Sequence, residues 1–327
     1  MDARERFLRV AQGQPVDRVP YLEEAIRKEV LRRWRREGLS RSVTEDNYRQ
    51  FFGLDKHEYF YLAMEPPLHG SLKSRRDFER LQEAYRSYLP DFRQPQFWLE
   101  KANQRRGRDY PLGIMGWRGF MLPLFTHRRE WSSLRDVLLA LHDHPQPLKE
   151  TLELVADCYI ETVRLALQHL EFDFGLVSEP IASPTGPVIS PAMYREFVLP
   201  PIRRIVAFFH EQGVRPVIFR SLSNANAIIP MAVEAGADGL WIGQTAGVVD
   251  YLAMRKSYPH LLLMGGLDST VLARDGAAIQ AEVDAKVPFL LASGRYLPFL
   301  DDNPREHIPY RNYVFYRQAL RRACEGD

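Results

Sequence analysis

The second half of the chain repeats one unit, a short apolar run followed by a segment with helical periodicity. Runs that are apolar at nearly every position are typical of strands buried on both faces of a parallel sheet. The candidate strands are residues 17–24, 58–64, 112–117, 174–178, 216–219, 239–242, 261–264 and 296–298. Eight strand–helix repeats predict an α/β fold, a single (β/α)8 TIM barrel over residues 1–327, with an open doubly wound sheet as the alternative.

A helix is expected before the first strand. Asp2 can cap it, and Phe7, Val10 and Ala11 recur at helical spacing. The barrel should therefore carry an N-terminal helical extension.

A further helix is expected to start at Ser190, which can act as its N-cap. Pro200 and Pro201 are expected to break this helix, because proline has no backbone N–H to donate.

The composition limits the possible partners. Hydrophobic residues make up 45% and charged residues 26% of the 327 residues, which is ordinary for a globular protein. The net charge is +2 and the basic residues are dispersed, so no nucleic-acid partner is expected. No apolar run approaches the roughly 18 residues of a membrane span, and the charged N-terminus lacks a signal peptide's apolar stretch. Cys158 and Cys324 have no metal-ligand spacing and suit a reducing compartment. These features predict a cytoplasmic protein.

Polar side chains follow most of the candidate strands, which is where a barrel places its active site. The candidate site residues are Glu24, Trp117, Arg118, Glu179, Arg220, Ser221, Asn224, Trp241, Gln244, Asp268, Tyr296 and Asp301. We expect them to form a pocket that holds both carboxylates and guanidinium groups. Side-chain alternation lets only one of Glu23 and Glu24 point inward, and Glu24 is the candidate.

Arg220 directly follows an apolar strand and must be paired there, because a buried unpaired charge is very costly. Its partner is expected to be Glu179 or Asp268 in a structural ion pair, or else an anionic substrate. Glu179 and Asp268 are the candidate catalytic acid or base, with a pKa raised by burial. Asp268 could equally cap the next helix.

Four stretches of the chain carry recognisable motifs: RERFL with PVDRVP within 4–20, GPVISPAMYREFVLP at 186–200, EAGADG at 234–239 and MGGLD at 264–268. They resemble the uroporphyrinogen decarboxylase (URO-D) superfamily, which includes corrinoid- and thiol-linked methyltransferases. Asn224 fits the usual Asn of that family. The resemblance implies a barrel that often dimerises, so a homodimer is expected.

The same resemblance marks the chain as a divergent member. Uroporphyrinogen decarboxylases carry Met-Arg-Gln-Ala-Gly-Arg-Tyr where residues 21–27 read YLEEAIR, so the tetrapyrrole-binding arginines are absent. Zinc methyltransferases carry His-x-Cys where this chain has Arg220 and Leu222, neither of which can bind zinc. A His expected after the last strand is replaced by Asp302. No metal site is therefore expected.

Three functions fit these observations. The first is a lyase, decarboxylating or otherwise rearranging a carboxylated and partly aromatic small molecule without metal or cofactor. Arg220 and Arg118 would hold its anionic group, and Trp117 and Trp241 would stack on its apolar part. The second is a corrinoid-linked methyltransferase or demethylase, with the corrinoid supplied by a partner protein. The third is a non-catalytic barrel that binds a small molecule.

Overall fold

Seven parallel strands form the central sheet of the computed structural model, which describes residues 1–68, 70–124 and 131–326. In sheet order they are β1 (Glu58–Tyr61), β2 (Leu112–Trp117), β3 (Phe174–Ser178), β6 (Val217–Leu222), β7 (Gly239–Gly243), β8 (Leu262–Met264) and β9 (Tyr296–Leu297). The sheet is curled, with an inner and an outer face, and its order follows the order of the chain. A small antiparallel pair, β4 (Ala182–Ser183) and β5 (Gly186–Pro187), follows β3.

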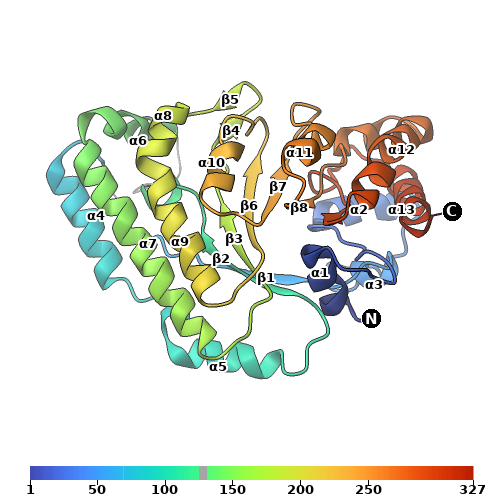
Figure 1. The fold of residues 1–327 in the computed structure, drawn as a ribbon, viewed down its shortest axis with the longest axis horizontal. Coiled ribbons are helices and arrows are strands. Elements are labelled where there is room, and N and C mark those ends of the chain that lie inside the picture. The colour runs from blue at the N-terminus through green and yellow to red at the C-terminus, as the bar shows by residue number, and fades with distance from the viewer. Residues whose placement is uncertain (69, 125–130, 327) are drawn as a thin grey trace.

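Helices connect the strands and cover the outer face of the sheet (Figure 1). They are α1 (Ala3–Gln12), α2 (Lys28–Arg36), α3 (Tyr48–Phe51), α4 (Arg75–Ser87), α5 (Pro95–Gln104), α6 (Trp131–Asp143), α7 (Pro145–Leu167), α8 (Pro191–Met193), α9 (Leu199–Glu211), α10 (Ile229–Glu234), α11 (Tyr251–Ser257), α12 (Gly276–Ala292) and α13 (Tyr310–Glu325). None of the helices among the described residues has the length and apolar character needed to cross a membrane.

The expected first strand, residues 17–24, does not form. The N–H of Tyr21 is used by the Asp55 carboxylate at 2.7 Å, and the preceding Pro20 has no N–H, so a regular strand ladder is not available here. The segment nevertheless lies between the two edges of the sheet. The Asp55 N–H, just before β1, donates to the Tyr21 carbonyl at 2.8 Å, while the Glu23 carboxylate is hydrogen bonded by the backbone of Leu300, beyond β9.

The inner face of the curled sheet is a packed core. It combines inward side chains such as Leu176, Ile218 and Leu297 with Leu22 from the segment between the edges. Helix α1 covers one end of this core through Phe7, whose ring lies 5.0 Å from that of Phe174. The cavity left inside has a volume of about 20 Å³, which is room for about one water molecule. This inner cavity is therefore too small to hold a substrate.

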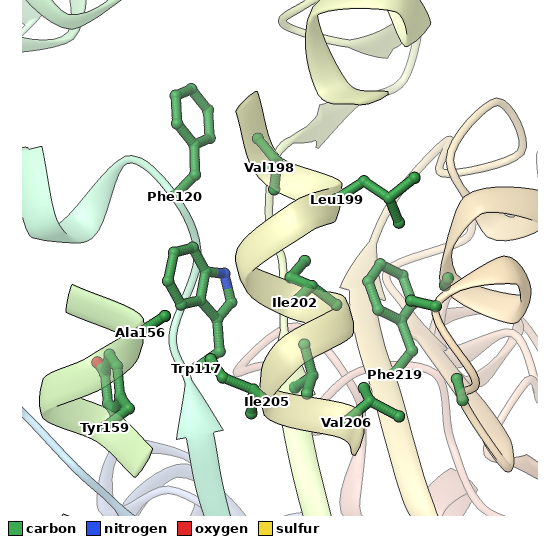
Figure 2. Packing of buried hydrophobic residues seen from close by; sticks show 14 of the residues in the cluster. Trp117, Phe120, Ala156, Tyr159, Val198, Leu199, Ile202, Ile205, Val206 and Phe219 are labelled. Atoms are coloured by element: carbon green, nitrogen blue, oxygen red, sulfur yellow. The ribbon is translucent and has the colours of Figure 1, made fainter. Parts of the chain in front are cut away.

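The outer face packs against the long helices (Figure 2). Trp117 lies between α7 and α9, with its ring 6.1 Å from that of Tyr159 on α7. Alternation alone would place Trp117 on the same face as Met115, but the pairing of β2 with β3 shifts between these two residues. The irregularity turns Trp117 into the outer layer while Met115 remains inside.

The expected break at Pro200 and Pro201 is not observed. Residues 191–211 are helical throughout, and the turn just before the prolines, η3 (Tyr194–Val198), is a π-helix. Pro200 lies at the start of α9, in the first turn, where a missing N–H is tolerated. The wider π turn accommodates the prolines without ending the helix.

Candidate functional site at the C-terminal ends of the strands

Arg220 and Glu24 form an ion pair on the inner side of the sheet. Arg220 lies near the end of β6, and its Nη2 donates to Oε1 of Glu24 from the segment between the sheet edges. The guanidinium also lies over the indole of Trp241, 4.4 Å from the ring centre. The expectation that Glu179 or Asp268 pairs with Arg220 is therefore wrong, because the protein partner is Glu24.

The guanidinium of Arg220 is only partly satisfied by Glu24. Its Nε is buried and has no hydrogen-bond partner among the described residues. A buried donor without a partner is uncommon in folded proteins and needs an explanation, such as a ligand. The arrangement leaves Arg220 able to donate to a further oxygen atom.

Two tyrosines extend this pair towards solvent. Tyr59 and Tyr61 on β1 point to the same face, with their rings 4.8 Å apart, and Tyr59 lies 6.4 Å from the ring of Trp241. Tyr61 is 40% exposed, so the aromatic wall reaches the surface. Neither tyrosine was predicted from the sequence as a site residue, although their spacing of two within a predicted strand was a usable signal.

The surroundings of Glu24 favour its neutral form more than solvent favours the neutral form of an exposed carboxyl group. Burial raises the pKa of Glu24 and outweighs the opposing effect of Arg220, and the nearby Asp302 raises that pKa further. Asp302 itself is paired with Arg305 at 2.6 Å. Glu24 is thus a carboxyl group next to a cation. A second anion nearby would easily shift the protonation of Glu24.

Glu23 points in a different direction from Glu24. Its carboxylate accepts hydrogen bonds from Tyr316 Oη at 2.9 Å and Arg317 Nη1 at 3.1 Å, both on α13. Burial raises the pKa of Glu23 to about 7. This contact ties the segment between the sheet edges to the C-terminal helix.

Arg118 lies near the same tyrosine wall. Its guanidinium is 5.9 Å from the ring centre of Tyr61 and 3.5 Å from Oε2 of Glu65. The other oxygen of Glu65 is buried without a partner among the described residues. Arg118 is therefore close to the tyrosines beside the Arg220 pair, and its contact with Glu65 is long.

Glu179, a predicted catalytic residue, lies in the outer layer and is 1% exposed. It accepts hydrogen bonds from Nε1 of Trp117 at 2.9 Å and from the Phe120 N–H at 3.0 Å. Burial raises its pKa to about 7 against the effect of these hydrogen bonds. Ser221 donates to the Glu179 carbonyl at 2.7 Å. The structure thus places the side chains of Glu179, Trp117 and Ser221 together, in a different layer from the side chains of Arg220 and Trp241.

Asp268 and Tyr296 also have structural contacts. Asp268 caps the 3-10 turn η4 (Ser269–Ala273) by accepting from the Thr270 N–H at 2.8 Å, the alternative role expected for it. Tyr296 is buried in the outer layer and donates to the Gly265 carbonyl at 2.9 Å. Neither placement brings the side chain to the Arg220 pair.

Asp301 connects the loops that follow the last strands. Its carboxylate accepts from the N–H and Oγ1 of Thr245, at 2.7 and 2.8 Å, and from the Ser269 N–H at 2.9 Å. It is 3% exposed. Asp301 therefore supports the rim of the site from below the surface.

Gln244 and Asn224 lie on the loops around this rim. Gln244 is exposed, has a φ of 51°, and its Nε2 is 3.5 Å from Oδ1 of Asp302. Asn224 Nδ2 is 3.4 Å from the Pro184 carbonyl in the β4–β5 turn. Of the two, Gln244 is the closer neighbour of the Glu24 environment, through Asp302.

The described residues contain no group of three or more His, Cys, Asp or Glu side chains arranged to hold a metal ion. Arg220 can only donate hydrogen bonds, and Leu222 on the same strand is apolar, so neither side chain can bind a metal ion.

Three comparisons relate the chain to known proteins. The profile of the uroporphyrinogen decarboxylase (URO-D) family matches residues 113–294. A uroporphyrinogen decarboxylase from Dechloromonas aromatica is 26% identical over 185 residues, covering 54% of this chain and 50% of that protein. One from Neisseria meningitidis is 23% identical over 217 residues, covering 64% of this chain and 59% of that protein. The chain thus spans about half the length of the curated relatives it matches.

Among solved structures, a methyltransferase from Methanosarcina mazei has a TM-score of 0.65 and 16% sequence identity. The match covers 100% of this chain and 99% of that chain. At this identity the likeness concerns the fold alone.

Proposed function

This chain belongs to the uroporphyrinogen decarboxylase (URO-D) family, and we propose that it is a lyase acting on a small carboxylated molecule at the Arg220–Glu24 pair. We further propose that the segment containing Glu24 takes the place of the eighth strand in a barrel of the (β/α)8 type. The reaction would then occur at the C-terminal ends of the strands, as in other barrels.

The observation that supports this proposal most is the incomplete pairing of Arg220. Its Nε has no partner in the described part of the chain, while Nη2 donates to Glu24 and the guanidinium plane lies over Trp241. A guanidinium presents donors in a rigid fork that matches two carboxylate oxygens. A substrate carboxylate can therefore take up the free donor and compete with Glu24 for the rest.

Glu24 is the proposed proton donor, in place of Glu179 and Asp268. A substrate carboxylate at Arg220 places a second negative charge beside Glu24, which favours the protonated form of Glu24. In a decarboxylation, the C–C bond to the carboxylate breaks, CO₂ leaves, and the electron pair stays on the substrate carbon. That carbon takes the proton from Glu24, which is later reprotonated from solvent.

No metal enters the proposed reaction, because the positions at 220 and 222 supply no metal ligand. Arg118 is proposed to add positive charge at the rim, since its contact with Glu65 is 3.5 Å. Tyr59 and Tyr61 would line the apolar or aromatic part of the substrate, the role predicted for Trp117.

Methyl transfer is the second candidate, because the solved structure with a similar fold is that of a methyltransferase. This function would require a corrinoid protein as partner. Co-purification of a corrinoid protein with the chain, together with methyl transfer to it, would favour this candidate over the lyase.

The test of the proposal is the binding of small carboxylic acids, measured by calorimetry on the wild type and on Arg220→Ala. We expect affinity to fall by about tenfold or more, the effect of losing one charge-assisted hydrogen bond. Arg32→Gln is the matched control, since Arg32 is exposed on α2 and its loss removes the same charge. Equal affinity in Arg220→Ala and wild type would reject the proposal. Binding without release of CO₂ or another product would favour the non-catalytic barrel.

A further inference from the structure

A second cleft lies beside β1, where residues 56–60 and Glu24 of the segment between the sheet edges contribute to its lining. Its volume is about 300 Å³, at the lower end of the range for small-molecule sites. The lining includes Arg49, Lys56, His57, Glu58 and Arg105. Glu24, His57 and Tyr59 line both this cleft and the small inner cavity, so the cleft shares Glu24 with the Arg220 pair, while Arg49 and His57 lie outside that pair.

The two carboxylates of the cleft are already paired. Glu58 is bound by Arg105 at 2.8 Å and by Lys56 at 3.1 Å. Glu24 is bound by Arg220. Neither acid is therefore available to a further cation in the cleft.

Arg49 is the cationic side chain in the lining of the cleft that remains after Lys56 and Arg105 are paired with Glu58. Its guanidinium lies 5.0 Å from the ring centre of Tyr48, and it forms no ion pair with any residue in the described part of the chain. Its Nε is buried and has no hydrogen-bond partner there. A buried guanidinium donor is normally satisfied by a carbonyl, a carboxylate or a ligand.

His57 presents a second unsatisfied nitrogen to the same region. Its Nδ1 is buried without a partner among residues 1–68, 70–124 and 131–326. Burial lowers the pKa of His57 to about 4, and the charge of Arg49 contributes to this. The ring is therefore neutral near pH 7 and carries one N–H, so it adds no charge to the cleft.

We propose that this cleft binds a small oxyanion, a carboxylate or a phosphate group, between Arg49 and His57. The anion would neutralise the unpaired guanidinium and accept hydrogen bonds from Arg49 and from the His57 ring. A cation is disfavoured, because the site already holds an unpaired positive charge and its acids are occupied. This site is separate from the one proposed at Arg220, and it stands without that proposal.

The experiment measures binding of inorganic phosphate and, separately, of acetate to the full chain by calorimetry. In Arg49→Gln we expect affinity for the bound probe to fall by about tenfold or more. Arg32→Gln, which removes an exposed charge on α2, should bind as the wild type does. Phosphate binding that Arg49→Gln weakens would identify a phosphate site, and acetate binding that Arg49→Gln weakens would identify a carboxylate site.

A second measurement follows the ring nitrogens of His57 by NMR, which tests the site even where a variant changes stability. The Nδ1 resonance should shift during titration of the wild type, and the shift should be absent in Arg49→Gln. Unchanged affinity in Arg49→Gln, or no binding of either probe, would overturn the cleft site. Loss of binding in Arg220→Ala alone would also overturn it, while supporting the function proposed for Arg220.

Discussion

Glu24 is partly buried and Glu179 fully buried, both near the same end of the sheet, and burial raises the pKa of both carboxyl groups. They differ in the layer that they face. Glu24 faces inward and meets a guanidinium beside an exposed tyrosine, whereas Glu179 faces the helices and meets the neutral N–H groups of Trp117 and Phe120. Both orientations follow from the local backbone. Glu24 lies on the irregular segment between the sheet edges, and Glu179 contacts Trp117, which the irregular pairing of β2 with β3 turns outward.

This difference distinguishes a candidate reactive carboxyl group, that of Glu24, from a structural one, that of Glu179. An ion pair near solvent can exchange one anion for another, so Glu24 and Arg220 are able to respond to a substrate. Glu179 is 1% exposed, and its hydrogen bonds hold residues 117–120 to the end of β3. A raised pKa alone therefore does not identify the reactive carboxyl, since structural groups show it as well.

The largest expected effect comes from removing the proposed proton donor. Glu24→Gln should lower the rate of CO₂ release from a panel of aromatic and aliphatic carboxylic acids by roughly a hundredfold or more. It should not weaken carboxylate binding, because it frees Arg220 from its ion pair. The matched variant Glu179→Gln should keep the rate within a few fold. A rate loss confined to Glu179→Gln would reverse the assignment.

A smaller effect is expected on stability. The folded-state pKa of Glu179, about 7, lies above its ordinary 4.5, so the folded protein binds this proton more tightly than the unfolded chain. Its contribution is fully present below about pH 4.5 and is lost as pH rises through 7, for a total of roughly 3 kcal/mol. Urea unfolding at pH 5 and pH 8 should show a smaller pH-dependent drop in Glu179→Gln than in wild type. Identical drops in the free energy of unfolding of the two proteins would show that burial does not raise the pKa of Glu179.

The smallest effect tests the surroundings of Glu24. Asp302 raises the pKa of Glu24, so Asp302→Asn should lower that pKa. The pH at which carboxylate affinity declines should move down accordingly, with the maximal affinity at low pH little changed. Asp143→Asn, on α6, is a control that removes one carboxylate elsewhere. An upward shift in Asp302→Asn would contradict the electrostatic description.

Much of the strand pattern could be predicted from the sequence. The apolar runs at 239–242 and 261–264 became β7 and β8 within one residue, because strands buried on both faces need apolar side chains at successive positions. The same reasoning predicted that Arg220 requires a partner. It could not identify Glu24, which is 196 residues away and lies on a segment with no strand ladder.

The remaining errors have local causes. Residues 17–24 were expected to form a strand, but Asp55 uses the Tyr21 N–H. Trp117 was expected at the pocket, but the shift in the β2–β3 pairing turns it outward and takes it to Glu179. Such irregularities depend on the neighbouring strand and leave no mark in the apolar pattern of the strand itself.

The central claim is that Arg220 and Glu24 respond together to a substrate carboxylate. It is tested most directly by the protons taken up when a small carboxylic acid binds at pH 8, measured by calorimetry in two buffers of different ionisation enthalpy. Wild type and Glu179→Gln should take up protons as the carboxylate binds, and Glu24→Gln should take up fewer or none. Binding without proton uptake by the wild type, or equal uptake by Glu24→Gln, would contradict the account.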